Sequence, residues 1–367
     1  MPEVDAVEIN FNFLSDVLKF MSLIDIKSLF KSELLQMFKD TNYPNYRVEQ
    51  IYSWLVKGVC SFDEMLNIPK SMRNELSEKF YIANTKISRK LTSKLDGTIK
   101  YLFELNDGEF IESVLMKYNH GYTICISTQV GCKMGCSFCA TGKTGFSRNL
   151  TASEMLAQIQ SAQIDNKIRI SNVVLMGMGE PLDNYDNVIK FLRLVSSDEH
   201  LNIGMRHISL STCGIINKIY DLAKENLQLT LSISLHAPSD QIRNTLMPIN
   251  RKFNIDELLK ACKFYIDKTK RRISFEYTMI SGVNDTKECA IELAHKLSGL
   301  LCHVNLIPVN SVDFINENYQ KSSRESLEKF MNILSKYGVN ATVRRTLGAD
   351  INASCGQLKR KLSSLEV

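Results

Sequence analysis

The chain has 367 residues, of which 44% are apolar and 23% charged, and it contains seven prolines. This composition supports a sizeable hydrophobic core and excludes a disordered chain, a collagen helix and a long coiled coil. Ten cysteines are too few for a secreted disulfide scaffold of this length, which favours a reducing compartment. The net charge of +5 allows an anionic partner without requiring one.

The N-terminal residues show no targeting signal. No stretch approaches the roughly 18 apolar residues of a membrane span, and Glu3, Asp5 and Glu8 stand where a signal peptide carries Lys or Arg. We therefore expect a cytoplasmic protein that does not enter a membrane. Met21 begins a cleaner amphipathic pattern, which allows residues 1–20 to be an extension upstream of the true start.

The next two segments differ in their periodicity. In residues 21–82, apolar residues recur at helical spacing in three stretches separated by turn residues, at 28–38, 48–58 and 71–80. This pattern predicts a small helical accessory domain. Residues 83–121 instead alternate between apolar and polar side chains around DG and NDGE turns, which predicts a connector of β-hairpins.

From residue 122 to 348, β-branched runs alternate with amphipathic stretches, as in repeated βα units around a parallel sheet. The strands are predicted at 122–128, 171–178, 206–212, 229–236, 272–280 and 302–310. A seventh extended run covers 339–348, and a polar tail follows at 349–367. Six units are fewer than the eight of a closed barrel, so we predict an α/β fold with a partial (βα)6 barrel whose active site lies at the strand carboxyl ends.

A cysteine motif follows the first predicted strand directly. Cys132, Cys136 and Cys139 have the spacing CxxxCxxC. Three thiolates can hold three corners of a 4Fe-4S cluster and leave the fourth iron open for a ligand. A zinc ribbon is the alternative, but it usually needs a second cysteine pair or a nearby histidine, and the nearest one upstream is His120.

The cysteine loop after the first strand of a partial barrel resembles the hallmark of radical S-adenosylmethionine (SAM) enzymes. Further segments resemble the RlmN/Cfr family of RNA methyltransferases: MGMGEPLDN (176–184), LSTCGI (210–215), SLHAP (234–238) and RRTLGADINASCGQL (344–358). Pro181 and the double arginine at 344–345 favour the RlmN branch over the Cfr branch. The resemblance covers nearly the whole chain from Ser22 onward.

The resemblance implies methylation of carbon 2 of an adenine, at adenosine 2503 of 23S rRNA and adenosine 37 of tRNAs. It also implies one 4Fe-4S cluster, two SAM molecules per turnover as methyl donor and radical source, an electron donor such as flavodoxin, and a monomeric enzyme. Carbon 2 is electron-poor and has no lone pair, so it suits a radical reaction better than a polar transfer. Methylation at adenine carbon 8, as in Cfr, and a non-catalytic, zinc-stabilised RNA-binding protein remain as alternatives.

Three catalytic residues follow from the same resemblance. Cys355 matches the cysteine that becomes S-methylcysteine, and Cys125 matches the thiol that resolves the protein–RNA adduct by forming a disulfide with it. Glu112 matches the proposed base for the carbon 2 proton. Outside the family context, a cysteine in the apolar strand of Cys125 is most often a core residue, and Glu112 in its alternating strand would be a solvated carboxylate.

The resemblance also implies residues that bind SAM at the strand ends, where glycines allow backbone approach and polar groups offer hydrogen bonds. These are Gly179, Glu180, Ser211, Ser234, Leu235, His236 and Asn310. A basic rim for RNA is formed in this hypothesis by Lys143, Arg148, Arg206, Arg344, Arg345, Lys359, Arg360 and Lys361, with solvated surface charge as the alternative for each. In the helical domain the candidates for RNA contact are Tyr43, Tyr46, Arg47 and Trp54. Packing is the simplest role for Cys60, Cys213, Cys262, Cys289 and Cys302.

Overall fold

A computed structural model describes residues 23–310 and 319–358. The predicted extension at 1–20 and the basic run at 359–361 lie outside these residues. The chain divides into two compact units between Asn84 and Thr85. No helix in the described ranges is long and apolar enough to cross a membrane.

The first unit contains the three predicted helices, which are confirmed as α2 (Lys31–Phe38), α3 (Asn45–Lys57) and α4 (Lys70–Lys79). A short parallel pair, β1 (Ile24–Asp25) with β2 (Phe80–Tyr81), joins the two ends of the unit, and a 3-10 turn covers Phe62–Glu64. The buried face of α3 is made by Val48, Ile51, Tyr52 and Leu55, at the spacing of one helical stripe. The helix ends at Gly58, whose φ of 88° is the left-handed conformation typical of a helix C-terminus.

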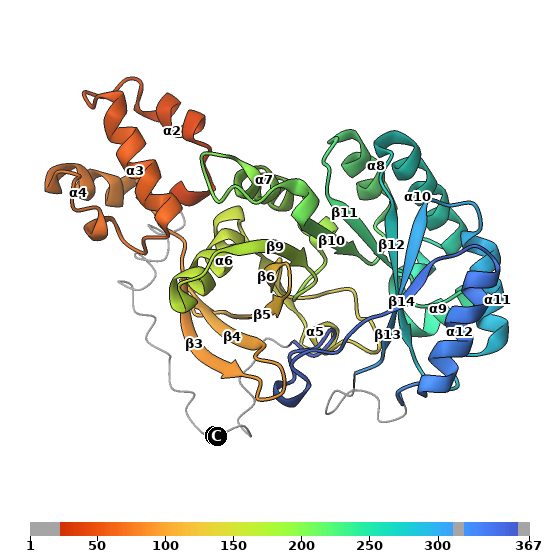
Figure 1. Ribbon diagram of the computed structural model, residues 1–367. Helices are drawn as coiled ribbons and strands as arrows, with labels where there is room; N and C mark the ends of the chain where they lie inside the picture. Colours follow the sequence, from red (N-terminus) through yellow and green to blue (C-terminus); the bar gives the residue numbers. More distant parts are fainter. Residues whose placement is uncertain (1–22, 311–318, 359–367) are drawn as a thin grey trace, which may run out of the picture. The chain divides into compact units, whose positions relative to one another are not determined.

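Within the described part of the second unit, one ten-stranded sheet has the order β14-β13-β12-β11-β10-β9-β6-β5-β4-β3 (Figure 1). The six predicted barrel strands are confirmed as β6 (Gly121–Cys125), β9 (Ile170–Leu175), β10 (Ile208–Thr212), β11 (Thr230–Ser234), β12 (Ile273–Met279) and β13 (Cys302–Pro308). The seventh extended run forms β14 (Ala341–Val343), which pairs in parallel with β13. The parallel strands do not close on themselves, so the predicted open partial barrel is confirmed.

The predicted hairpins are also present, as β3 (Thr85–Thr92), β4 (Ile99–Leu105) and β5 (Phe110–Tyr118). These antiparallel strands continue the barrel sheet, because β5 pairs with β6 and places Val114 opposite Cys125. Glu112 and Cys125 therefore belong to neighbouring strands of one sheet.

Helices form in the amphipathic stretches between the parallel strands. They are α6 (Ala152–Asn166), α7 (Tyr185–Ser196), α8 (Ile216–Lys224), α10 (Ile255–Thr269), α11 (Lys287–Leu297) and α12 (Arg324–Lys336). Polar N-caps begin several of them: the side chains of Thr151 and Asn254 accept hydrogen bonds from the third residue of α6 and α10. In Figure 1, α8, α10, α11 and α12 lie outside the arc of the strands.

Four short elements have no clear sequence signal. β7 (Gln129–Gly131) and β8 (Phe146–Asn149) pair in antiparallel fashion on either side of the cysteine loop, and α5 (Ala140–Lys143) lies between them. A further short helix, α9 (Asp240–Leu246), follows β11. Elements of three to seven residues are too short for their periodicity to be read from sequence.

Arg243, on α9, ties together the ends of two barrel strands. Its guanidinium donates hydrogen bonds to the carbonyl oxygens of Cys213 (2.7 Å), Ser234 (3.1 Å) and Leu235 (3.0 Å). It also donates to Oδ1 of Asn250 at 2.9 Å, and the residue is only 1% exposed. The loops after β10 and β11 are thus held at a fixed separation by one buried side chain.

We expect Arg243→Met to destabilise the protein strongly, because it leaves buried carbonyl oxygens without donors, at a cost of about 3 kcal/mol. The matched control is Arg193→Met, which removes an exposed ion pair with Glu225 (2.6 Å) and costs at most about 1 kcal/mol. Thermal unfolding of both variants, followed by circular dichroism, measures the difference. Equal melting temperatures for the two variants would contradict the structural role of Arg243.

Candidate active site

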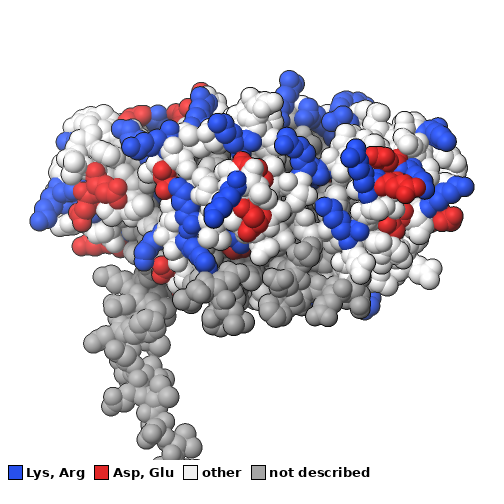
Figure 2. Space-filling model, turned by 60° about the horizontal axis from the view of Figure 1, so that its bottom comes forward, with Lys and Arg blue, Asp and Glu red and all other residues white. Residues whose placement is uncertain are grey.

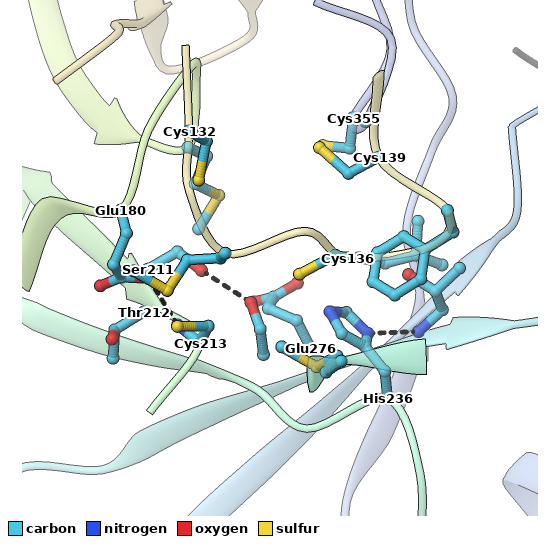
Figure 3. Close-up of a pocket in the computed structure, with 18 of the residues that line it drawn as sticks. Cys132, Cys136, Cys139, Glu180, Ser211, Thr212, Cys213, His236, Glu276 and Cys355 are labelled. Atoms are coloured by element: carbon cyan, nitrogen blue, oxygen red, sulfur yellow. Dashed lines mark hydrogen bonds between the residues drawn. The ribbon is translucent and has the colours of Figure 1, made fainter. Parts of the chain in front are cut away.

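A cavity opens at the carboxyl ends of the parallel strands, as the barrel architecture predicts. Nearly all the site residues expected from the sequence line it together (Figure 3). They come from the cysteine loop, the loops after β9, β10, β11 and β13, and the C-terminal tail: Cys132, Cys136, Cys139, Gly179, Glu180, Ser211, Ser234, His236, Asn310 and Cys355. The predicted Leu235 is fully buried and does not reach the cavity wall.

The cysteine loop is pinned at its base by the β7–β8 pair. The backbone N–H of Cys132 donates to the carbonyl oxygen of Gly145 at 2.9 Å. Gly131 has a φ of 78°, and a Cβ at this position would lie 1.9 Å from that same oxygen. Only glycine can occupy the position without displacing the backbone that begins the cysteine motif.

Burial favours the protonated form of two thiols of the motif. It raises the pKa of Cys132 to about 12 and also raises the pKa of Cys136. A metal centre binds thiolates, so its insertion must release these protons. Within the described ranges, no three His, Cys, Asp or Glu side chains converge as they would on a single metal ion. The three thiols of the motif line one cavity, as an iron–sulfur cluster with one open iron requires.

The glycines after β9 let two loops approach closely. A Cβ on Gly179, whose φ is 102°, would lie 2.6 Å from Cβ of Gln129. A Cβ on Gly177 would lie 2.6 Å from the carbonyl oxygen of Ile126. Glycine is thus needed at both positions for a second reason, because a larger side chain would overlap the segment that leads into the cysteine loop.

Glu180 is fully engaged with the chain itself. Its carboxylate accepts hydrogen bonds from the backbone N–H groups of Leu182 (3.0 Å) and Cys213 (2.7 Å), while its own N–H donates to Gln129. Burial raises its pKa. The side chain therefore fixes the loop after β10 against the loop after β9, and the cavity is shaped by this contact.

His236 is a neutral hydrogen-bond donor in the cavity. Its Nδ1 accepts a hydrogen bond from the backbone N–H of Thr278 at 2.9 Å, which places the ring hydrogen on Nε2. Burial, with a smaller contribution from Arg243, lowers its pKa to about 3. The edge-to-face contact with Phe138 of the cysteine loop, at 4.8 Å between ring centroids, orients the ring.

The C-terminal tail docks against the cysteine loop. The backbone N–H of Ala140 donates to the carbonyl oxygen of Gly356 at 2.8 Å, and the hydroxyl of Thr141 donates to that of Leu358 at 2.7 Å. Asn310 donates its side-chain amide to the carbonyl oxygen of Cys355 at 3.1 Å. These contacts bring Cys355 beside Cys139, as Figure 3 shows.

A smaller cavity adjoins the first, and Cys355 lines both of them. Cys125, the last residue of β6, lines the smaller cavity and is 8% exposed. Burial, and then the proximity of Cys355, raises the pKa of Cys125 to about 12. The two thiols expected to form a transient disulfide therefore share one cavity wall.

Glu112 lies outside the residues that line either cavity. It is 6% exposed, and its Oε1 lies 3.2 Å from Nζ of Lys100 on β4. The alternative interpretation of Glu112 as a solvated carboxylate is therefore wrong, because both faces of β5 are buried over residues 111–116.

The comparisons with known proteins agree with this geometry. The Radical SAM superfamily matches residues 126–297, and the ribosomal RNA large subunit methyltransferase N-terminal domain matches residues 24–82. The probable dual-specificity RNA methyltransferase RlmN of Alkaliphilus oremlandii is 53% identical over 341 residues, covering 93% of this chain and 99% of the relative. The RlmN of Clostridium botulinum (strain Eklund 17B) is 56% identical over 328 residues, covering 89% and 94%. The chain belongs to the RlmN family of RNA methyltransferases.

A solved structure extends the similarity to three dimensions. The radical SAM methyltransferase from Sphaerobacter thermophilus is 42% identical, with a TM-score of 0.86 over 91% of this chain and 99% of that one. As a member of the RlmN family, the protein is a radical SAM enzyme that methylates RNA. Membership implies a 4Fe-4S cluster and SAM, and the three thiols around the open cavity fit that cluster.

The residues expected to form a basic rim differ in their environments. Lys143, Arg206 and Arg345 are exposed. Arg148 is instead engaged with the carboxylates of Asp107 (2.6 Å) and Glu154 (2.8 Å). The face in Figure 2 carries Lys and Arg in several separate groups among acidic and uncharged side chains. Charge alone therefore does not outline the path of an RNA across this member of the RlmN family.

In the first unit, the aromatic candidates for RNA contact are largely tied to neighbouring side chains. Tyr43 donates its hydroxyl to Glu75 at 2.6 Å, and Trp54 donates its indole N–H to Asn67 at 2.6 Å. Tyr46 is 54% exposed, and the guanidinium of Arg47 lies 5.0 Å from its ring centroid. Tyr46 is thus the most exposed of these three aromatic side chains.

Several residues line the cavities although the sequence did not predict them there. Arg344 lines both cavities, and its Nη1 lies 3.6 Å from Oε2 of Glu276, which lines the larger one. The adjacent Cys355, and to a lesser extent Glu276, raise the pKa of Arg344, so it stays charged. Cys213 is buried as predicted, as are Cys262 and Cys289, and it also lines the larger cavity. The packing role predicted for Cys60 is wrong, because the residue is exposed.

We expect Gly131→Ala to disrupt the cysteine loop, because the new methyl group would overlap the carbonyl oxygen that holds Cys132. Gly108→Ala is the matched control: its φ of 80° imposes the same backbone strain of about 1–2 kcal/mol, but a Cβ there meets nothing within 4 Å. Iron content and visible absorption after anaerobic reconstitution measure the effect. The Gly131 variant should lose most of its iron and the Gly108 variant should keep it; equal loading would disprove the steric argument.

Proposed function

We propose that this enzyme methylates carbon 2 of adenine, at adenosine 2503 of 23S rRNA and adenosine 37 of tRNAs. The curated relatives that the chain matches along most of its length are dual-specificity RNA methyltransferases. The observation that carries the proposal is that Cys355 lines two adjoining cavities, one with Cys132, Cys136 and Cys139 and the other with Cys125. This arrangement suits a sulfur that receives a methyl group in the cavity of the three cysteines and is freed from the RNA adduct in the cavity of Cys125.

The cluster would be held by Cys132, Cys136 and Cys139, with SAM at the strand ends beside Gly179 and His236. Two SAM molecules per turnover would supply a methyl group and a radical that abstracts a hydrogen atom, with one-electron exchange through the cluster. Flavodoxin, or a donor of similar potential, would supply electrons to a monomeric enzyme in the cytoplasm.

In this proposal Cys355 accepts the first methyl group and becomes S-methylcysteine. Its methyl carbon, after loss of a hydrogen atom, forms a bond to carbon 2 of the adenine. The resulting adduct radical must lose one electron, which the cluster would take back, and Glu112 takes up the proton of carbon 2. The Cys125 thiolate then attacks the Cys355 sulfur, so a disulfide forms, the carbon–sulfur bond breaks, and the released carbon takes a proton to become the methyl group. External reduction of the Cys125–Cys355 disulfide completes the cycle.

The position of the methyl group tests the proposal directly. A strain that lacks the gene, complemented with this chain, should contain 2-methyladenosine in 23S rRNA and in tRNA. Nucleoside mass spectrometry against synthetic 2-methyl- and 8-methyladenosine standards separates the two isomers. 8-Methyladenosine as the main product would overturn carbon 2 as the target, and an unmodified tRNA pool would restrict the enzyme to ribosomal RNA.

The two cysteines should fail at different steps. Cys355→Ala should retain the cluster absorption and lose methyl transfer completely, because no sulfur remains to carry the methyl group. Cys125→Ala should form the covalent protein–RNA adduct and fail to release it, which denaturing gel electrophoresis detects. Cys262→Ala, a buried cysteine away from both cavities, serves as the control. Multiple turnovers by the Cys125 variant would exclude the resolving role.

A further inference from the structure

Lys100 and Glu112 form a buried ion pair beneath the catalytic tail. Lys100 is opposite Val114 in the β4–β5 register, and Glu112 lies two residues from Val114 on the same face of β5. Diagonal neighbours of this kind are within reach of long side chains. Nζ of Lys100 lies 3.2 Å from Oε1 of Glu112, and each side chain is only 8% exposed.

The same ammonium group also holds the tail. Nζ of Lys100 donates a hydrogen bond to the carbonyl oxygen of Asn352 at 3.3 Å. Asn352 has a φ of 49° and lies three residues before Cys355. One cation therefore contacts the proposed base on one side and the segment that presents the proposed methyl carrier on the other.

The tail does not depend on Lys100 to stay docked. The Asp350 carboxylate accepts hydrogen bonds from the Ser93 hydroxyl (2.7 Å) and the Lys94 backbone N–H (2.9 Å). The Asp96 carboxylate accepts one from the backbone N–H of Gly348 at 2.9 Å. Removal of the Lys100 ammonium group should therefore change the local position of Glu112 more than the docking of the tail.

We infer that Lys100 is a positioning residue that holds the Glu112 carboxylate in a fixed relation to the Cys355 segment. The inference rests on the proposed roles of Glu112 and Cys355. A buried cation with two partners on different segments restricts both of them, and its loss leaves a buried carboxylate without this partner. Methylation of Cys355 does not involve Glu112, so it should proceed without Lys100. Release of the RNA adduct requires the carbon 2 proton to be removed, so release should be slow without Lys100.

Single-turnover reactions of the reconstituted full-length enzyme with a 23S rRNA transcript separate these steps. Mass spectrometry of the protein reports S-methylation of Cys355, and denaturing gels report formation and decay of the adduct. Lys100→Met should methylate Cys355 to the wild-type extent, while its adduct should decay at least about tenfold more slowly, since a positioned base contributes roughly 10²–10⁴ in rate. Lys100→Arg keeps the cation and its donors, so it should restore most of the decay rate.

Lys86→Met is the matched control, because Lys86 and Glu104 form an ion pair of the same length, 3.2 Å, between β3 and β4, with the Lys86 side chain 76% exposed. The adduct of the Lys86→Met variant should decay at the wild-type rate. Lys100→Gln, which keeps donors without charge, replaces Lys100→Met if that protein does not fold, with the same slow decay expected.

Wild-type adduct decay in the Lys100→Met or Lys100→Gln variant would overturn the inference. Loss of Cys355 methylation in proportion to adduct decay would also overturn it, because the residue would then support the fold in general. Glu112→Gln, run in parallel, distinguishes the two proposals. Slow decay in Glu112→Gln with normal decay in Lys100→Met defeats only the positioning role, whereas normal decay in Glu112→Gln defeats the proposed base itself.

Discussion

The active site depends on the docking of the C-terminal tail onto the cysteine loop. The Ala140 backbone N–H and the Thr141 hydroxyl each donate a hydrogen bond to a carbonyl oxygen of the tail. These contacts lie directly beside the motif that is predicted to hold the cluster. Asn310 adds a third, from the end of β13 to the Cys355 carbonyl. Without these contacts the barrel would still present three thiols, but the sulfur that is proposed to carry the methyl group would be absent from both cavities.

Buried charge organises the walls of the site. Arg243 binds carbonyl oxygens at the ends of β10 and β11, and Glu180 binds backbone N–H groups of the loops after β9 and β10. In each case one charged side chain satisfies polar groups of two loops that the parallel sheet leaves side by side. Lys100 repeats this arrangement on the antiparallel side of the sheet. The loops of the cavity are thus held by side chains that do not themselves need to touch a ligand.

Much of the architecture follows from sequence periodicity, and the reasons for the exceptions are physical. The six barrel strands and the hairpins were predictable because their apolar spacing and turn residues are local properties. The alternative reading of Glu112 as a solvated carboxylate was wrong because alternation in one strand does not show that both faces of β5 are covered. Arg243 and Lys100 could not be identified, since their roles arise from carbonyl groups that are distant in sequence. The tail cysteine was found only through family resemblance, because no pattern within the residues links Cys355 to a loop more than two hundred positions earlier.

The position of Cys355 on a wall common to two cavities determines which movement brings its sulfur from one cavity to the other. A sulfur in such a place can change the cavity it faces by torsion about its own Cα–Cβ bond, without any displacement of the backbone. Side-chain torsions of this kind take picoseconds to nanoseconds when space allows. A change of cavity by the free or methylated side chain would therefore need no slower movement of the docked tail.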